Sequence, residues 1–114
     1  MRICFIGDSF VNGVGDDSGL GWIGRLGVAL RAAGCDLTLY NLGVRRDTSA
    51  DIARRWRAEA EARLPEGVDG RLVFAFGTND GTPGEGPGRV RVPTPNRLPT
   101  PRRSWGPRGR GDRR

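Results

Sequence analysis

Apolar residues along this chain follow two patterns: short continuous runs, and longer segments in which they recur every three or four positions. The runs over residues 2–6, 37–42 and 71–76 predict three β-strands. Between them, residues 21–33 and 48–64 carry the longer repeat, which predicts two amphipathic helices. The predicted order of elements is therefore β-α-β-α-β.

Two local features refine the predicted helices. Thr48 and Asp51 have the spacing of a capping box, in which each side chain accepts a hydrogen bond from the other residue's backbone, at the start of the second helix. Trp22 and Trp56 fall on the apolar stripes of the two helices. We therefore expect both tryptophans to lie in the core.

Strands that are apolar throughout are typical of parallel sheets covered by helices on both faces. The chain is thus predicted to form an α/β fold with three layers. Right-handed crossovers bring the carboxyl ends of all the strands to one edge, where such sheets bind ligands. The glycine-bearing segments 7–9, 41–43 and 77–80 end or follow the strands, so we expect them to converge there.

The sequence changes character after Asp80. Residues 1–80 are nearly neutral, with ten Arg against eleven Asp and Glu, whereas residues 81–114 hold nine Arg against two acids. The second segment also holds seven Gly, seven Pro and few large apolar residues, a composition that predicts disorder. We therefore expect a folded domain over residues 1–80 and a disordered tail over residues 81–114.

The two cysteines, Cys4 and Cys35, are expected to be buried and reduced, because two are too few for a disulfide framework. Met1 leads directly into the first predicted strand, so no signal peptide is expected. No apolar run reaches the roughly 18 residues of a transmembrane helix. These features predict a cytoplasmic protein without a membrane partner.

The predicted edge of the sheet carries groups suited to ester hydrolysis. That reaction needs a nucleophile, a base that deprotonates it, and donors aimed at the developing oxyanion. Ser9 follows the first strand and could supply the hydroxyl, while the backbone N–H groups of Ser9 and Gly43 and the Asn79 amide are candidate donors. Glycine at position 43 would also let a substrate approach the backbone closely.

Three segments resemble the first three sequence blocks of the SGNH, or GDSL-type, esterase and lipase family. They are FIGDSFVNG at 5–13, NLGVRRDTS at 41–49 and FGTND at 76–80. The resemblance implies a flavodoxin-like α/β/α fold, a small-molecule ester as substrate, Ser9 as nucleophile and Gly43 and Asn79 in the oxyanion hole. It also implies that Asp8 shapes the turn rather than acting as the triad acid. No metal or organic cofactor is implied.

The chain departs from this family after its third block. The family's fourth block carries an Asp-x-x-His pair that supplies the base and its orienting acid, and this chain has no such block and no histidine. Strands beyond the third are also missing, so the outer edge of the third strand is expected to be bare. A reading-frame shift after Asp80 would explain the excess of Arg, Pro and Gly, and a genuine short variant is the alternative.

We therefore predict a GDSL-type serine esterase that is inactive or crippled as written. One alternative is a pseudoenzyme that binds acyl ligands without hydrolysing them. Another is unspecific binding of nucleic acid by the Arg-rich tail, which would weaken with salt. Asp16 and Asp17 are expected to be solvated loop residues rather than metal ligands, and the sequence leaves the oligomeric state open.

Overall fold

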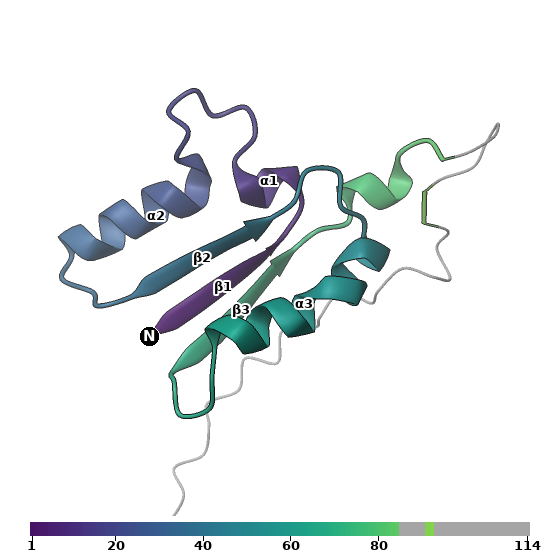
Figure 1. The fold of residues 1–114 in the computed structure, drawn as a ribbon. Helices are drawn as coiled ribbons and strands as arrows, with labels where there is room; N and C mark the ends of the chain where they lie inside the picture. Colours follow the sequence, from purple (N-terminus) through teal and green to yellow (C-terminus); the bar gives the residue numbers. More distant parts are fainter. Residues whose placement is uncertain (85–90, 93–114) are drawn as a thin grey trace, which may run out of the picture.

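The three strands form one parallel sheet in the computed structural model, which describes residues 1–84 and 91–92 (Figure 1). They are β1 (Arg2–Gly7), β2 (Thr38–Gly43) and β3 (Gly70–Ala75), in the order β2-β1-β3. In this register Gly7, at the carboxyl end of β1, lies beside Gly43 on one side and Ala75 on the other. The predicted strands and their parallel arrangement are confirmed.

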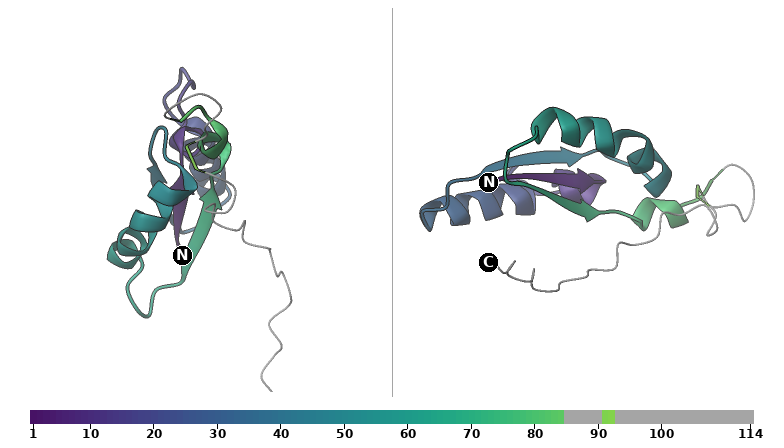
Figure 2. Two further views of the ribbon diagram at one scale, coloured as in Figure 1. Left: turned by 90° about the vertical axis from the view of Figure 1, so that its right-hand side faces the viewer. Right: turned by 90° about the horizontal axis from the view of Figure 1, so that it is seen from below.

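The helices pack on both faces of this sheet. The two long helices are α2 (Gly21–Ala32) and α3 (Ser49–Arg63), close to their predicted ranges. They lie on opposite sides of the strands, which gives the three predicted layers (Figure 2). The sequence pattern did not predict two short elements, α1 (Ser9–Asn12) and the 3₁₀ helix η1 (Thr78–Gly81).

The core has one half on each face of the sheet. On the α3 side, Ile52 of α3 packs against buried side chains of the sheet, which are Cys4 and Ile6 of β1 and Leu42 of β2. On the other side, Phe5 packs with Val11 of α1 and Ile23 of α2. Successive residues of β1 thus enter opposite halves of the core, as the alternation of side chains along a strand requires.

The two tryptophans differ in their environments. Trp56 is partly buried and packs against the core with its ring 5.6 Å from Phe74, so its predicted core position is confirmed. The prediction for Trp22 is wrong, because 43% of this residue is exposed. Its ring meets only the edge of the core at Phe5, and its indole N–H donates to the Phe10 carbonyl at 2.9 Å. The hydrogen bond from the indole N–H to this carbonyl of α1 holds Trp22 at the rim of the core.

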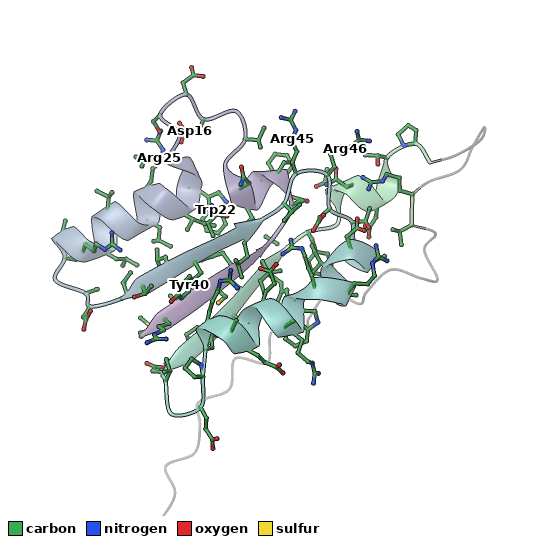
Figure 3. The ribbon with its side chains drawn as sticks, viewed as in Figure 1. Asp16, Trp22, Arg25, Tyr40, Arg45 and Arg46 are labelled. Atoms are coloured by element: carbon green, nitrogen blue, oxygen red, sulfur yellow. The ribbon has the colours of Figure 1, made fainter. Side chains whose placement is uncertain are left out.

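The loop before α2 is organised by Asp16 rather than left to solvent. Its carboxylate accepts hydrogen bonds from the Ser18 hydroxyl, from the Gly21 N–H and from Arg25, which also forms an ion pair with it at 3.0 Å. The Asp16 and Arg25 side chains lie against each other in Figure 3. The hydrogen bonds from Arg25, and then those from Ser18, hold the pKa of the Asp16 carboxyl well below its usual range. Asp16 therefore anchors the start of α2.

Both cysteines are free. Cys4 is buried as predicted, and burial raises the pKa of its thiol. Cys35 is exposed, so the prediction of burial is wrong at that position. It follows α2, in the connection to β2.

Part of the predicted tail contacts the domain. The Val92 N–H donates to the Asp80 carbonyl at 3.2 Å, and the Val92 side chain is buried. The Arg91 N–H donates to the Thr82 carbonyl at 3.1 Å. Residues 85–90 and 93–114, for which disorder is predicted, lie outside the described residues. In the part of the chain that the structure describes, no helix has the length and apolar character needed to cross a membrane.

Candidate active site

Ser9 lies at the carboxyl edge of the sheet, where β1 passes into α1. It is the first residue of the helix, and the buried Asp8 precedes it as N-cap. The Asp8 carboxylate accepts a hydrogen bond from the Phe10 N–H at 3.0 Å, which fixes the turn that presents Ser9. The residue is partly exposed, and among the described residues its hydroxyl has no hydrogen-bond partner.

Gly43 brings α1 against the end of β2. A Cβ at this position would lie 2.2 Å from the Asn12 nitrogen and 2.8 Å from the Asp8 carbonyl oxygen. The packing of the chain against itself therefore requires glycine at this position. The Gly43 N–H donates to Oδ1 of Asn41 at 3.0 Å, so in this structure it already has a partner.

Two asparagines that sequence reasoning missed hold this junction together. The Asn12 side chain donates to the Gly43 carbonyl at 3.2 Å, and the Asn41 side chain donates to the Asn12 carbonyl at 3.3 Å. These bonds connect α1 to β2 beside Ser9. Both residues lie inside the segments that resemble the family, but a sequence pattern does not show which backbone group a side chain reaches.

Asn79 lies in η1, beyond the end of β3. Its side-chain amide donates to the Asp47 carbonyl at 2.9 Å, which joins η1 to the loop after β2. An amide nitrogen carries two hydrogens, so this bond leaves one donor of Asn79 for another partner. The neighbouring Asp80 is buried and accepts from the Ser49 N–H at 2.7 Å, which connects η1 to the start of α3.

The loop after β2 contains a strained residue. Residues 44–47 form a turn closed by a hydrogen bond of 3.2 Å from the Asp47 N–H to the Val44 carbonyl. Arg46, the third residue of this turn, has φ of 71°, a value that glycine adopts readily and arginine does not. The side chains of Arg45 and Arg46 are exposed and extend from this loop at the carboxyl edge of the sheet (Figure 3).

Arg55 supports the site from the α3 side. Its guanidinium donates to the Asp47 carboxylate at 2.7 Å and to the Gly7 carbonyl at 3.0 Å, two residues before Ser9. The Arg55 and Asp47 side chains are only 19% and 14% exposed, so this ion pair is largely shielded from water. It fixes the end of β1 relative to the loop after β2.

The predicted capping box at the start of α3 is confirmed. Asp51 accepts from the Thr48 N–H at 2.9 Å, and the Thr48 hydroxyl oxygen accepts from the Asp51 N–H at 3.3 Å. The Thr48 N–H lowers the pKa of the Asp51 carboxyl, with smaller contributions from the Thr48 hydroxyl, Arg54 and Arg91, while partial burial opposes them.

The structure therefore brings the three sequence segments together at one edge. The junction of β1 and α1 contacts the end of β2 through Asn12, and the loop after β2 contacts η1 through Asn79. The chain has no histidine to take a proton from Ser9. The arrangement holds a candidate nucleophile and candidate oxyanion donors at a common edge without the usual base.

Comparisons with known proteins agree with this architecture. Residues 5–100 match the model of the GDSL-like Lipase/Acylhydrolase family. The solved structure of AlinE4, an SGNH-hydrolase family esterase, is similar with 32% sequence identity and a TM-score of 0.57. Two mutant forms of that esterase match with the same TM-score, at 32% and 30% identity. No curated protein sequence matches the chain.

The similarity to these esterase structures covers 69% of this chain and 41% of theirs. The chain therefore spans less than half the length of the solved structures that it matches. The family model, in contrast, covers most of the chain and continues past Asp80. On the fold, the three converging segments and this match, the chain belongs to the GDSL-like lipase and acylhydrolase family of SGNH hydrolases.

Proposed function

We propose that this chain carries the nucleophile half of a serine ester hydrolase active site and is catalytically crippled as it stands. In the complete reaction the Ser9 hydroxyl attacks the ester carbonyl carbon and the alcohol leaves, which forms an acyl-Ser9 intermediate. Water then releases the acid and restores the hydroxyl. The observation that supports this proposal best is the position of Ser9 at the first turn of α1, at the edge of the sheet that also carries Gly43 at the end of β2 and Asn79 in η1.

Three groups are proposed to stabilise the oxyanion. The Ser9 N–H belongs to the first turn of α1, where backbone donors have no acceptor inside the helix. Asn79 keeps one amide hydrogen beyond its bond to Asp47. The Gly43 N–H would have to exchange its bond to Asn41 for one to the substrate, so it is the least prepared of the three.

Loss of the base explains why activity is proposed to be low. In a well-studied serine protease, removing the histidine alone lowers turnover by about 10⁶-fold, and the remaining acceleration comes from binding and oxyanion donors. Ser9 without a base is a weak nucleophile at neutral pH. Substrate binding without turnover is the second candidate function, and the absence of histidine favours it.

Chemical rescue tests the role of Ser9. Hydrolysis of p-nitrophenyl acetate by the full chain and by Ser9→Ala is followed over a series of imidazole concentrations, with imidazole alone as the blank. If Ser9 is the nucleophile, imidazole as an external base raises the rate of the parent chain above that of the variant. Equal rates at every imidazole concentration would exclude Ser9 as a nucleophile and leave ligand binding as the function to test.

Binding of nucleic acid is a separate proposal that rests on the composition of residues 81–114, most of which lie outside the described residues. Nine arginines against two acids would attract phosphate without reading sequence. Titration of a short duplex at low and moderate salt tests it. Affinity that disappears at moderate salt and ignores sequence would mark this binding as an incidental property of the charge.

A further inference from the structure

The outer edge of β3 offers unpaired backbone groups to a partner. Among the described residues, β3 pairs only with β1. The Asp69 carbonyl accepts from the Arg2 N–H at 2.9 Å and so faces β1. Because backbone groups alternate in direction along a strand, those of residues 71, 73 and 75 face β1 as well. The N–H and C=O groups of Gly70, Leu72 and Phe74 therefore point away from the sheet.

Apolar side chains lie along this edge on the face that carries α3. Leu72 is 41% exposed, and Phe74 is partly buried beside it. Leu72 also lines an open groove of about 290 Å³, whose other walls come from α3 and the residue after it: Trp56, Arg57, Ala60, Glu61 and Leu64. A β-strand edge with exposed apolar groups and no inward charge on this face is a ready template for strand pairing.

The rim of the same groove carries two charges of opposite sign. Arg57 and Glu61 are both exposed and lie one turn apart on α3, on either side of Ala60, which is 6% exposed. Within the described residues neither forms an ion pair, and the Arg57 guanidinium lies 5.4 Å from the centre of the Trp56 ring. A plus and a minus charge placed in this way are complementary to the same surface turned by 180°.

We propose that the β3 edge and this groove form the interface of a two-fold symmetric dimer of the chain. Two β3 strands would pair antiparallel about Leu72, so that each Gly70 lies opposite Phe74 of the second copy. This register joins the six outward-facing residues, three from each copy, in hydrogen-bonded pairs. A two-fold axis at Leu72 is perpendicular to the sheet and places both α3 helices on the same face.

The charges on α3 fit this arrangement. Leu72 and Ala60 line the same groove, so an axis through Leu72 passes at the level of Ala60. The two α3 helices would then run antiparallel, with Arg57 of each copy facing Glu61 of the other. Because α3 packs on β1, strands spaced about 4.8 Å apart would separate the two helices by roughly 14 Å, a distance that the long side chains of Arg57 and Glu61 can bridge from both sides. This proposal does not depend on catalysis by Ser9.

Sedimentation velocity of the full chain over a concentration series tests the proposal. We expect a reversible monomer–dimer equilibrium with a dimer Kd below about 100 μM. Glu61→Arg places like charges opposite each other at two symmetric positions and should raise the dimer Kd by about tenfold. The double variant Arg57→Glu/Glu61→Arg restores opposite charges and should return the Kd close to that of the parent. Asp17→Arg, an equal change of charge on a distant exposed loop, is the control.

Leu72→Pro tests the strand pairing. The Leu72 N–H points away from β1, so proline at this position removes a donor at the axis and leaves the β1–β3 ladder in place. We expect a monomer with the far-ultraviolet circular dichroism of the parent. A parent chain that stays monomeric throughout the series would overturn the proposal and indicate that another segment of the chain covers this edge. Association unchanged by both Glu61→Arg and Leu72→Pro would overturn it in favour of a different surface.

Discussion

Arg46 is the residue where local geometry and residue type conflict most clearly. Of the described residues other than glycine, it alone has positive φ, at 71°. A side chain in this left-handed region costs about 1–2 kcal/mol relative to glycine. Strained backbone of this kind clusters at functional sites, and Arg46 lies in the loop that receives the Asn79 amide at the next residue.

Replacing Arg46 with glycine should therefore stabilise the chain. Relief of strain is partly offset by the greater freedom of glycine in the unfolded chain, so we expect a gain of about 0.5–1 kcal/mol in the free energy of unfolding. Urea denaturation of the parent and variant measures it. The neighbouring Arg45→Gly removes the same side chain at a residue whose φ is not positive, and should not stabilise. Equal effects of the two substitutions would contradict the assignment of strain to position 46.

Gly43 is fixed by packing. A Cβ there would meet the Asn12 backbone at 2.2 Å, so Gly43→Ala must displace α1. We expect it to lower the free energy of unfolding by about 3 kcal/mol. Gly67→Ala is the matched control, because a Cβ at Gly67 meets nothing within 4 Å and only its φ of 86° opposes the change, at a cost of about 1 kcal/mol. Similar urea midpoints for the two variants would contradict this expectation, because they would show that α1 moves at little cost to make room for the added methyl group.

At the scale of elements, the ion pair between Arg55 and Asp47 connects α3, the end of β1 and the loop after β2. Side-chain atoms of the two residues meet at 2.7 Å, and the same guanidinium reaches the Gly7 carbonyl. Neither side chain is more than 19% exposed, so solvent screens this pair less than the pairs on the surface. The position of Ser9 thus depends on a contact made from the opposite side of the sheet.

Arg55→Ala should be strongly destabilising. It leaves Asp47 without its partner and removes the bond to Gly7, and we expect a loss of about 2–4 kcal/mol. Arg54→Ala, which removes an ion pair with Asp51 from an arginine side chain that is 70% exposed, should cost less than about 1 kcal/mol. Thermal or urea unfolding compares them. A cost for Arg55→Ala as small as that for Arg54→Ala would mean that water reaches the pair freely.

The start of α3 should make stability depend on acid pH. The pKa of the Asp51 carboxyl is lowered in the folded chain, so its contribution is fully present above its ordinary pKa of about 3.9. That contribution is lost as the pH falls through the lower value of the folded state. Asp51→Asn should therefore be less stable than the parent at neutral pH and should approach it at low pH. A constant difference between the two from neutral to acid pH would contradict this role of the carboxylate.

At the scale of the whole molecule, the sequence pattern predicted the sheet and its long helices well, because continuous apolar runs and a repeat of three to four are direct consequences of burial. The pattern failed at Trp22. Its position on the apolar stripe of the helix predicted burial, but its indole N–H donates to the Phe10 carbonyl at the rim of the core. The hydrogen bonds of Asn12 and Asn41 and the packing at Gly43 depend on contacts distant in sequence. Periodicity holds no information about such contacts.

The candidate site was predictable in the same uneven way. The positions of Ser9, Gly43 and Asn79 at one edge followed from the topology of a parallel sheet, and the segments they occupy lie within the family match. The hydrogen-bond partners of these residues did not follow from the topology. Within the protein, the Gly43 N–H donates to Asn41 and one amide hydrogen of Asn79 donates to the Asp47 carbonyl. These hydrogen bonds hold the junctions at this edge of the sheet together.

Hydrolysis of p-nitrophenyl acetate without added base, by the full chain and by Ser9→Ala, shows whether Ser9 acts as a nucleophile without a histidine. We propose that Ser9 occupies the position of a nucleophile in a chain that lacks the histidine to activate it. We therefore expect parent and variant both to hydrolyse the ester at the background rate. Clear turnover by the parent that Ser9→Ala abolishes would contradict it, because some other group of this chain would then be acting as the base.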